Sequence, residues 1–156
     1  MGNTLAGDDG VGIVMLRALR ERLGKRPGLA FAELAGDLYA VWDLLPSTSS
    51  MIFLDAVMGN PPGRLVVGHT GPRAFSASFH QTDVSTVMES LSHLYDGQMP
   101  AWEIWGITVD PPRNLGEGLS SPVAEAADRA VCRLCGLIAG GGLLVDGQAV
   151  PPLSAP

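Results

Sequence analysis

Lysine is almost absent from this sequence of 156 residues, which contains Lys25 alone and has a net charge of −6. A large basic patch cannot form with so few cations, which argues against nucleic acids and anionic membranes as main partners. Long apolar runs are also missing, and no segment reaches the length of a membrane span. The N-terminus lacks the charged and then apolar layout of a signal peptide. We therefore expect a cytoplasmic protein.

Cysteine is scarce as well, since Cys132 and Cys135 are the whole supply. They lie three residues apart within a helical pattern, which does not indicate a disulfide framework. A single C-x-x-C without a second pair is weak evidence for zinc. We expect two partly buried thiols on a helix. The apolar fraction of 46% and charged fraction of 17% are typical of a compact globule.

Apolar runs alternate with helical patterns along the chain. We predict one domain over residues 1–138, followed by a flexible Gly/Pro-rich tail over residues 139–156. Strands followed by helices indicate an α/β fold with helices on both faces of a largely parallel sheet. The predicted strands cover residues 29–34, 51–57, 64–69 and 104–109, and the predicted helices cover residues 9–23, 38–45, 83–95 and 121–138. We expect Asp37 to cap the second of these helices and Ser121, followed by Pro122, to cap the last.

The stretch GNTLAGDDGVG, residues 2–12, is the most unusual part of the sequence. A glycine-rich turn that leads into a helix usually binds phosphate, because free N–H groups and the helix dipole attract anions. Here the turn carries the carboxylates of Asp8 and Asp9, which would repel a phosphate and attract a cation. We expect Asp8 to be the N-cap of the helix. Asp9 is then the residue left to face a metal or another cationic group.

Three residues are candidates for a site beyond the carboxyl ends of the strands, where open α/β sheets bind ligands. Asp9 follows the position where a first strand would end, Asp55 is the only charge in MIFLDAV, and His80 precedes a helix. Two carboxylates and an imidazole suit a borderline divalent metal, or could serve as acid–base groups. The alternatives are a helix cap at position 9, a solvated acid at position 55 and an ordinary loop histidine at position 80. We expect ordinary structural roles for His69, His93, Trp42, Trp102 and Trp105.

These motifs resemble those of a known family. GNTLAGDDGVG, FLDAV and FHQTD, in this order and at these spacings, resemble the hydrogenase maturation proteases, endopeptidases that trim the C-terminus of the large subunit of [NiFe] hydrogenases. Residues 107–123, ITVDPPRNLGEGLSSPV, resemble the family's late strand, Pro-rich loop and helix start. The likeness covers about residues 2–138. It implies a three-layer α/β/α fold with a twisted, mostly parallel sheet.

The resemblance also implies a function. Asp9, Asp55 and His80 match the family's metal-contacting residues, and nickel is expected as a feature of the substrate that these residues contact. The expected partner is a nickel-loaded [NiFe] hydrogenase large-subunit precursor, and the protein is expected to act as a monomer. The metal could polarise the scissile carbonyl or activate a water. Direct attack assisted by a carboxylate base is the alternative.

The sequence departs from the family at its start, because only Met1 precedes the turn. We expect the natural start to lie upstream, in a strand of about six apolar residues. Asp9 is also one methylene shorter than the Glu common in the family. Two other functions stay open at this point. One is a catalytically silent, nickel- or hydrogenase-binding chaperone of the same fold. The other is a nucleotide-binding module, against which the two acids of the turn argue.

Overall fold

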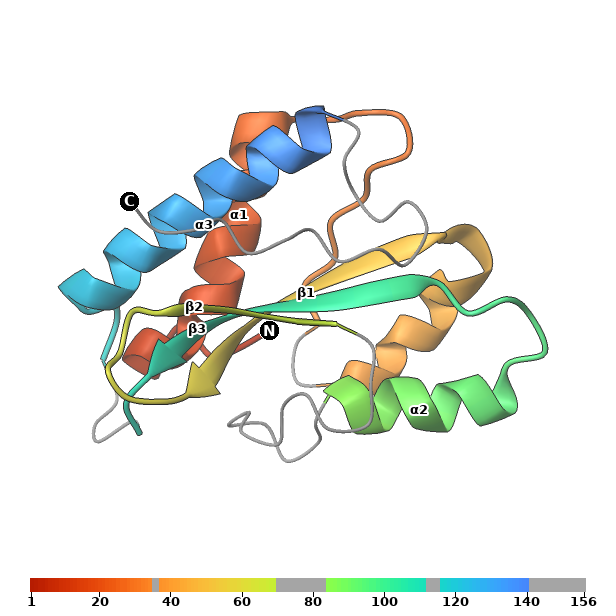
Figure 1. Ribbon diagram of the computed structural model, residues 1–156, viewed down its shortest axis with the longest axis horizontal. Helices are drawn as coiled ribbons and strands as arrows, with labels where there is room; N and C mark the ends of the chain where they lie inside the picture. The colour runs from red at the N-terminus through yellow and green to blue at the C-terminus, as the bar shows by residue number, and fades with distance from the viewer. Residues whose placement is uncertain (35–36, 70–83, 112–115, 141–156) are drawn as a thin grey trace.

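The computed structural model describes residues 1–34, 37–69, 84–111 and 116–140 (Figure 1). The described elements, in chain order, are the 3-10 helix η1 (Gly7–Gly10), α1 (Val11–Leu23), the 3-10 helix η2 (Leu38–Ser47), β1 (Ser50–Met58), β2 (Leu65–His69), α2 (Val84–Leu94), β3 (Ala101–Val109) and α3 (Ser121–Ala139). Most lie where the sequence predicts them. The predicted tail and the segment with His80 fall largely or wholly outside the described residues.

The described sheet has the strand order β1-β3-β2. β1 and β3 run parallel, with Asp55 opposite Gly106, whereas β2 runs antiparallel to β3, with Val66 opposite Gly106. The sheet is therefore mixed, and its central strand is β3. No described strand pairs with the outer edge of β1. The expectation of a further strand upstream of Met1 stays a prediction.

Helices cover both faces of this sheet, which gives the predicted three-layer α/β/α arrangement (Figure 1). Successive residues of a strand point to opposite faces. Leu54 and Ala56 of β1 accordingly join the core under α1 and α3, while Phe53 joins a second core under η2 and α2. Asp55 shares the face of Phe53 by this alternation. No described helix is both long and apolar enough to cross a membrane.

The predicted strand over residues 29–34 is wrong, because this segment holds only the isolated bridge between Arg26 and Leu29. No strand among the described residues lies beside it to supply a hydrogen-bond ladder. The segment is held by α1 instead: the Arg20 guanidinium donates to the Phe31 carbonyl at 3.3 Å. Arg17 Nη2 pairs with Glu33 Oε2 at 3.1 Å. Its apolar side chains Leu29 and Phe31 therefore pack on the core beside α1 and not within a sheet.

Two helix starts illustrate how well caps can be predicted. Asp37 is the N-cap of η2, as expected, and its Oδ1 accepts a hydrogen bond from the Tyr39 N–H at 3.0 Å. The helix that follows is of the 3-10 type and continues through Pro46 to Ser47. The N-cap of α3 is Ser120, one residue before the predicted Ser121. Pro122 still lies in the first turn, where its missing N–H costs nothing.

Candidate functional site

The turn over residues 2–10 is built around Asn3. Its Oδ1 accepts a hydrogen bond from the Leu5 N–H at 3.0 Å, and its own N–H donates to Asp9 Oδ2 at 2.7 Å. Gly2 has a φ of 127°, and a Cβ there would collide with the Asp9 carbonyl oxygen. Only glycine fits both the backbone conformation and this close approach. The turn thus fixes the Asp9 carboxylate through the backbone that precedes it.

The segment before α3 holds the outer side of the turn. The Gly7 N–H donates to the Gly116 carbonyl at 2.7 Å, and the Gly116 N–H donates to the Leu5 carbonyl at 3.0 Å. Asp8 accepts two hydrogen bonds from Ser120, one from its N–H at 2.6 Å and one from its hydroxyl at 2.8 Å. Carboxylate acceptors make stronger hydrogen bonds than neutral ones. The turn is consequently clamped to the start of α3.

The predicted role of Asp8 as the cap of its own helix is wrong. The N-cap of α1 is Gly10, and neither η1 nor α1 has a side-chain cap. Both Asp8 oxygens are engaged by Ser120, the N-cap residue of α3. A carboxylate near that helix N-terminus is also favoured by the dipole of α3. Asp8 therefore ties two helix starts together rather than capping the first.

Asp55 lies within β1, where its side chain is 1% exposed. Its Oδ1 accepts a hydrogen bond from the Ala56 N–H at 2.9 Å. The residue opposite is Gly106, where a Cβ would collide with Val57 Cγ2. A carboxylate is costly to bury unless hydrogen bonds or a counter-charge stabilise it. The prediction that Asp55 is buried within the strand is confirmed, and the solvated alternative is wrong.

Asp9 and Asp55 act on the same buried group, the amino group of Met1. Asp9 is 9% exposed. The Met1 ammonium donates a hydrogen bond to the carbonyl of Leu54, which is the residue before Asp55. Burial lowers the pKa of this amino group below its ordinary value of 8.0, while the charges of Asp55, Asp9 and Glu33 act in the opposite direction. η1, which carries Asp9, is in contact with β1, which carries Asp55, and both carboxylates are buried.

His80 lies in the range 70–83, outside the described residues. The chain returns to the described part at Val84, where α2 begins on the sheet face shared by Phe53 and Asp55. No group of three His, Cys, Asp or Glu side chains within the described ranges could hold a metal ion. His69 ends β2 opposite Glu103, at the level of Ile52 rather than Asp55. The described part of the site is thus a pair of carboxylates.

The residues that position this site were not predicted from the sequence. Ser120 and Gly116 hold the turn from the far end of the chain, and Asn3 fixes Asp9. The role of Asn3 could have been predicted, because the side-chain oxygen of an Asn commonly accepts a hydrogen bond from the backbone N–H two residues later, in an Asx turn. No local signal reveals the partners of Asp8 and Gly7, since they lie more than a hundred residues away.

No family model matches the sequence. A search of curated proteins finds Protein FrxA from Pyrococcus furiosus, which is 31% identical over 131 residues that cover 80% of this chain and 91% of that protein. Two solved structures from Thermococcus kodakarensis have a similar fold. The [NiFe] hydrogenase maturation protease HybD superposes with a TM-score of 0.71 at 23% identity, covering 87% of this chain and 93% of HybD. The maturation protease HycI gives a TM-score of 0.68 at 19% identity, with 88% of each chain covered.

Proposed function

Because this chain belongs to the hydrogenase maturation protease family, we propose that it is an endopeptidase that removes the C-terminal extension of a [NiFe] hydrogenase large-subunit precursor. The proposed substrate carries nickel, which the site contacts as part of that substrate. One structural observation carries the proposal: Asp9 in η1 and Asp55 in β1 are both buried, and η1 lies in contact with β1. Such a pair suits a cation presented by a docked protein.

The proposed roles follow from how each carboxylate is held. Asp9 Oδ2 accepts a hydrogen bond from the Asn3 N–H, which leaves Oδ1 as the oxygen that would contact a ligand. Asp55 is fixed by the rigid strand β1 and by the Ala56 N–H. His80 is the proposed third contact. The substrate's nickel would act as a Lewis acid on the scissile carbonyl or on a water. A carboxylate that accepts the proton of the attacking water is the alternative.

The test is incubation of the chain with nickel-loaded and nickel-free precursor, with the precursor C-terminus read by mass spectrometry. We expect cleavage of the nickel-loaded form only. Asp9→Asn and Asp55→Asn each remove a negative charge with almost no change in shape, and His80→Ala removes an imidazole. Each substitution should reduce processing by at least about a hundredfold, the scale for loss of a catalytic group. Circular dichroism should show that all three variants remain folded.

The outcomes separate the candidate functions. Processing at the wild-type rate by any two of the three variants would refute the assignment of the site. Binding of the precursor without any product would favour the second candidate, a maturation chaperone of the same fold. Among the described residues β1 lies at the edge of the sheet and pairs only with β3, which gives this second candidate a free strand edge next to Asp55 that could bind a partner without cleavage.

A further inference from the structure

Positive charge is distributed unevenly over the layers of this fold. Seven of the ten Lys and Arg residues belong to α1, α3 or the turn after α1, namely Arg17, Arg20, Arg22, Lys25, Arg26, Arg129 and Arg133. None occurs in residues 37–58 or 84–111, which comprise η2, β1, α2 and β3. The exposed charges of η2, α2 and their flanking residues are therefore acidic, apart from any charge on His93. They are those of Asp37, Asp43, Glu89 and Asp96.

The same layer exposes large apolar side chains. Tyr39 is 50% exposed, Trp42 42% and Leu94 68%, and these are three of the five large hydrophobic residues that are most exposed in the described ranges. Residues three apart in a 3-10 helix lie one above the other, so Tyr39 and Trp42 share one side of η2. The Trp42 ring meets the Tyr95 ring edge-on, with centroids 5.8 Å apart. Leu94 is the neighbour of Tyr95 in the chain.

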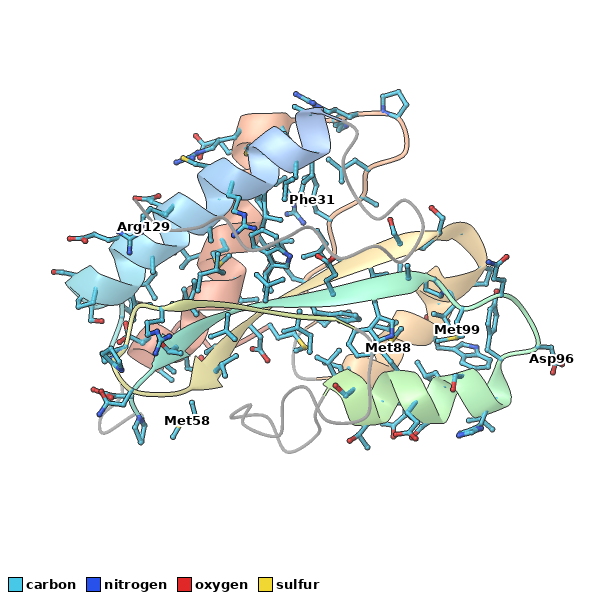
Figure 2. All side chains as sticks on the ribbon, in the orientation of Figure 1. Phe31, Met58, Met88, Asp96, Met99 and Arg129 are labelled. Carbon is cyan, nitrogen blue, oxygen red and sulfur yellow. The ribbon has the colours of Figure 1, made fainter. Side chains whose placement is uncertain are left out.

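We call Tyr39, Trp42, Leu94 and Tyr95, together with Asp43 and Asp96, which follow Trp42 and Tyr95 in the chain, the aromatic–acidic face. It lies at the end of the molecule away from the carboxyl end of β1. η2 ends at Ser47, three residues before β1 starts at Ser50, and Ser50 pairs with the start of β3 at Ala101. Figure 2 shows the same separation, with Asp96 and Met58 at opposite ends of the view. The face therefore does not belong to the Asp9–Asp55 site.

We propose that the aromatic–acidic face docks a surface of the hydrogenase precursor that is apolar at its centre and carries Lys and Arg around it. This inference rests on the proposed function and names a second contact with the same substrate. Tyr and Trp are the residues that most often anchor protein interfaces. Acidic residues next to such anchors steer positively charged partners and reject negatively charged ones. The occupant is thus a cationic protein surface.

Charge also argues against two other occupants. A second copy of this chain would place acidic faces against each other, at a net charge of −6 per copy, which like-charge repulsion disfavours. An anionic membrane surface is disfavoured for the same reason. A docking contact far from the cleaved bond would supply binding energy without taking part in the chemistry. Such a contact lowers KM and leaves kcat unchanged.

The test compares three proteins in cleavage of full-length, nickel-loaded precursor and in direct binding to it. The first is the wild type. The second carries Asp43→Lys and Asp96→Lys on the aromatic–acidic face. The third carries Glu21→Lys and Glu125→Lys on the exposed surface of α1 and α3, which changes net charge by the same amount. We expect the second protein to show KM and Kd raised about tenfold, with kcat unchanged and a weaker dependence on salt. The third should stay within about twofold of the wild type.

Leu94→Ser tests the apolar part of the face independently of charge, because this exposed side chain contributes little to the core. It should raise KM severalfold. Equal KM, Kd and salt dependence for the wild type and both face variants would overturn the docking proposal and leave the peptidase intact. If the wild type binds the precursor but does not cleave it, the proposed function fails, and loss of binding in the face variants still supports docking. No binding at all, or self-association of the wild type that Leu94→Ser abolishes, overturns docking.

Discussion

Gly12 offers a sharp test of how α1 packs on β1, because the helix backbone approaches the strand backbone closely there. A Cβ at position 12 would collide with the Leu54 carbonyl oxygen and lie 2.8 Å from the carbonyl carbon. Both are backbone atoms of a strand held in register with β3, so they cannot turn aside as a flexible side chain could. We predict that Gly12→Ala destabilises the protein by forcing α1 away from the residue that precedes Asp55.

The magnitude follows from two opposing effects. Replacing glycine by alanine within a helix gains about 0.5–1 kcal/mol, because glycine loses more backbone freedom on folding. Overpacking costs about 1–3 kcal/mol, and a rigid backbone neighbour favours the upper part of that range. The net expectation is a loss of about 1–2 kcal/mol. Gly136→Ala in α3 is the matched control, since a Cβ there meets nothing within 4 Å, and it should gain about 0.5–1 kcal/mol.

Urea unfolding followed by tryptophan fluorescence measures both effects, with thermal unfolding as a second readout. The two variants should differ by about 2–3 kcal/mol, which corresponds to a gap of about 5–10 °C in Tm for a domain of this size. Gly12→Ala should also slow precursor processing, because a shifted α1 carries η1 and Asp9 away from Asp55. If Gly12→Ala proved as stable and as active as Gly136→Ala, the close seating of α1 on β1 would be refuted.

Two further predictions concern interactions outside the site. Asp8→Ala and Ser120→Ala should each lower the free energy of unfolding by about 1–2 kcal/mol. Because the two residues bond to each other, the double variant should lose clearly less than the sum of the two single losses. Additive losses would mean that the clamp between the turn and α3 contributes nothing. The hydrogen bond from Arg17 holds the pKa of Glu33 below its ordinary value of 4.5. The charged form of Glu33 therefore stabilises the folded protein above pH 4.5. This stabilisation is lost as the pH falls through the lowered pKa. Glu33→Gln should therefore be slightly less stable than the wild type at neutral pH and equal to it in strong acid, whereas a difference that does not change with pH would contradict this reading of the pair.

Sequence patterns predicted those parts of the fold that are determined locally. α1 and α3 show the spacing of apolar residues that buries one side of a helix, and both end within a residue or so of the predicted position. β1 is almost continuously apolar because both of its faces are covered. The burial of Asp55 followed from the cost of placing an acid in such a strand. These inferences need no knowledge of distant residues.

The errors arose where a distant partner decides the outcome. An N-terminal acid of a helix usually caps that helix, but Asp8 is engaged by Ser120 instead. Residues 29–34 are short and mostly apolar, as many strands are, yet they lie against α1, where Arg17 and Arg20 bind them. The partner in each case belongs to another part of the fold. Whether His80 joins Asp9 and Asp55 stays a prediction, because it lies outside the described residues.

The clamp between Asp8 and Ser120 has a consequence for the order of assembly. The two residues are separated by 112 positions in the chain, so their contact closes one of the largest loops that this sequence can form. Such contacts form late in folding, because the loss of chain entropy on closing the loop must first be overcome. During synthesis the turn with Asp9 leaves the ribosome first, but its anchor emerges only after all three described strands have been made. A nascent chain should therefore acquire its sheet before it acquires a fixed Asp9. Competence to cleave would then arise as one of the last events of folding.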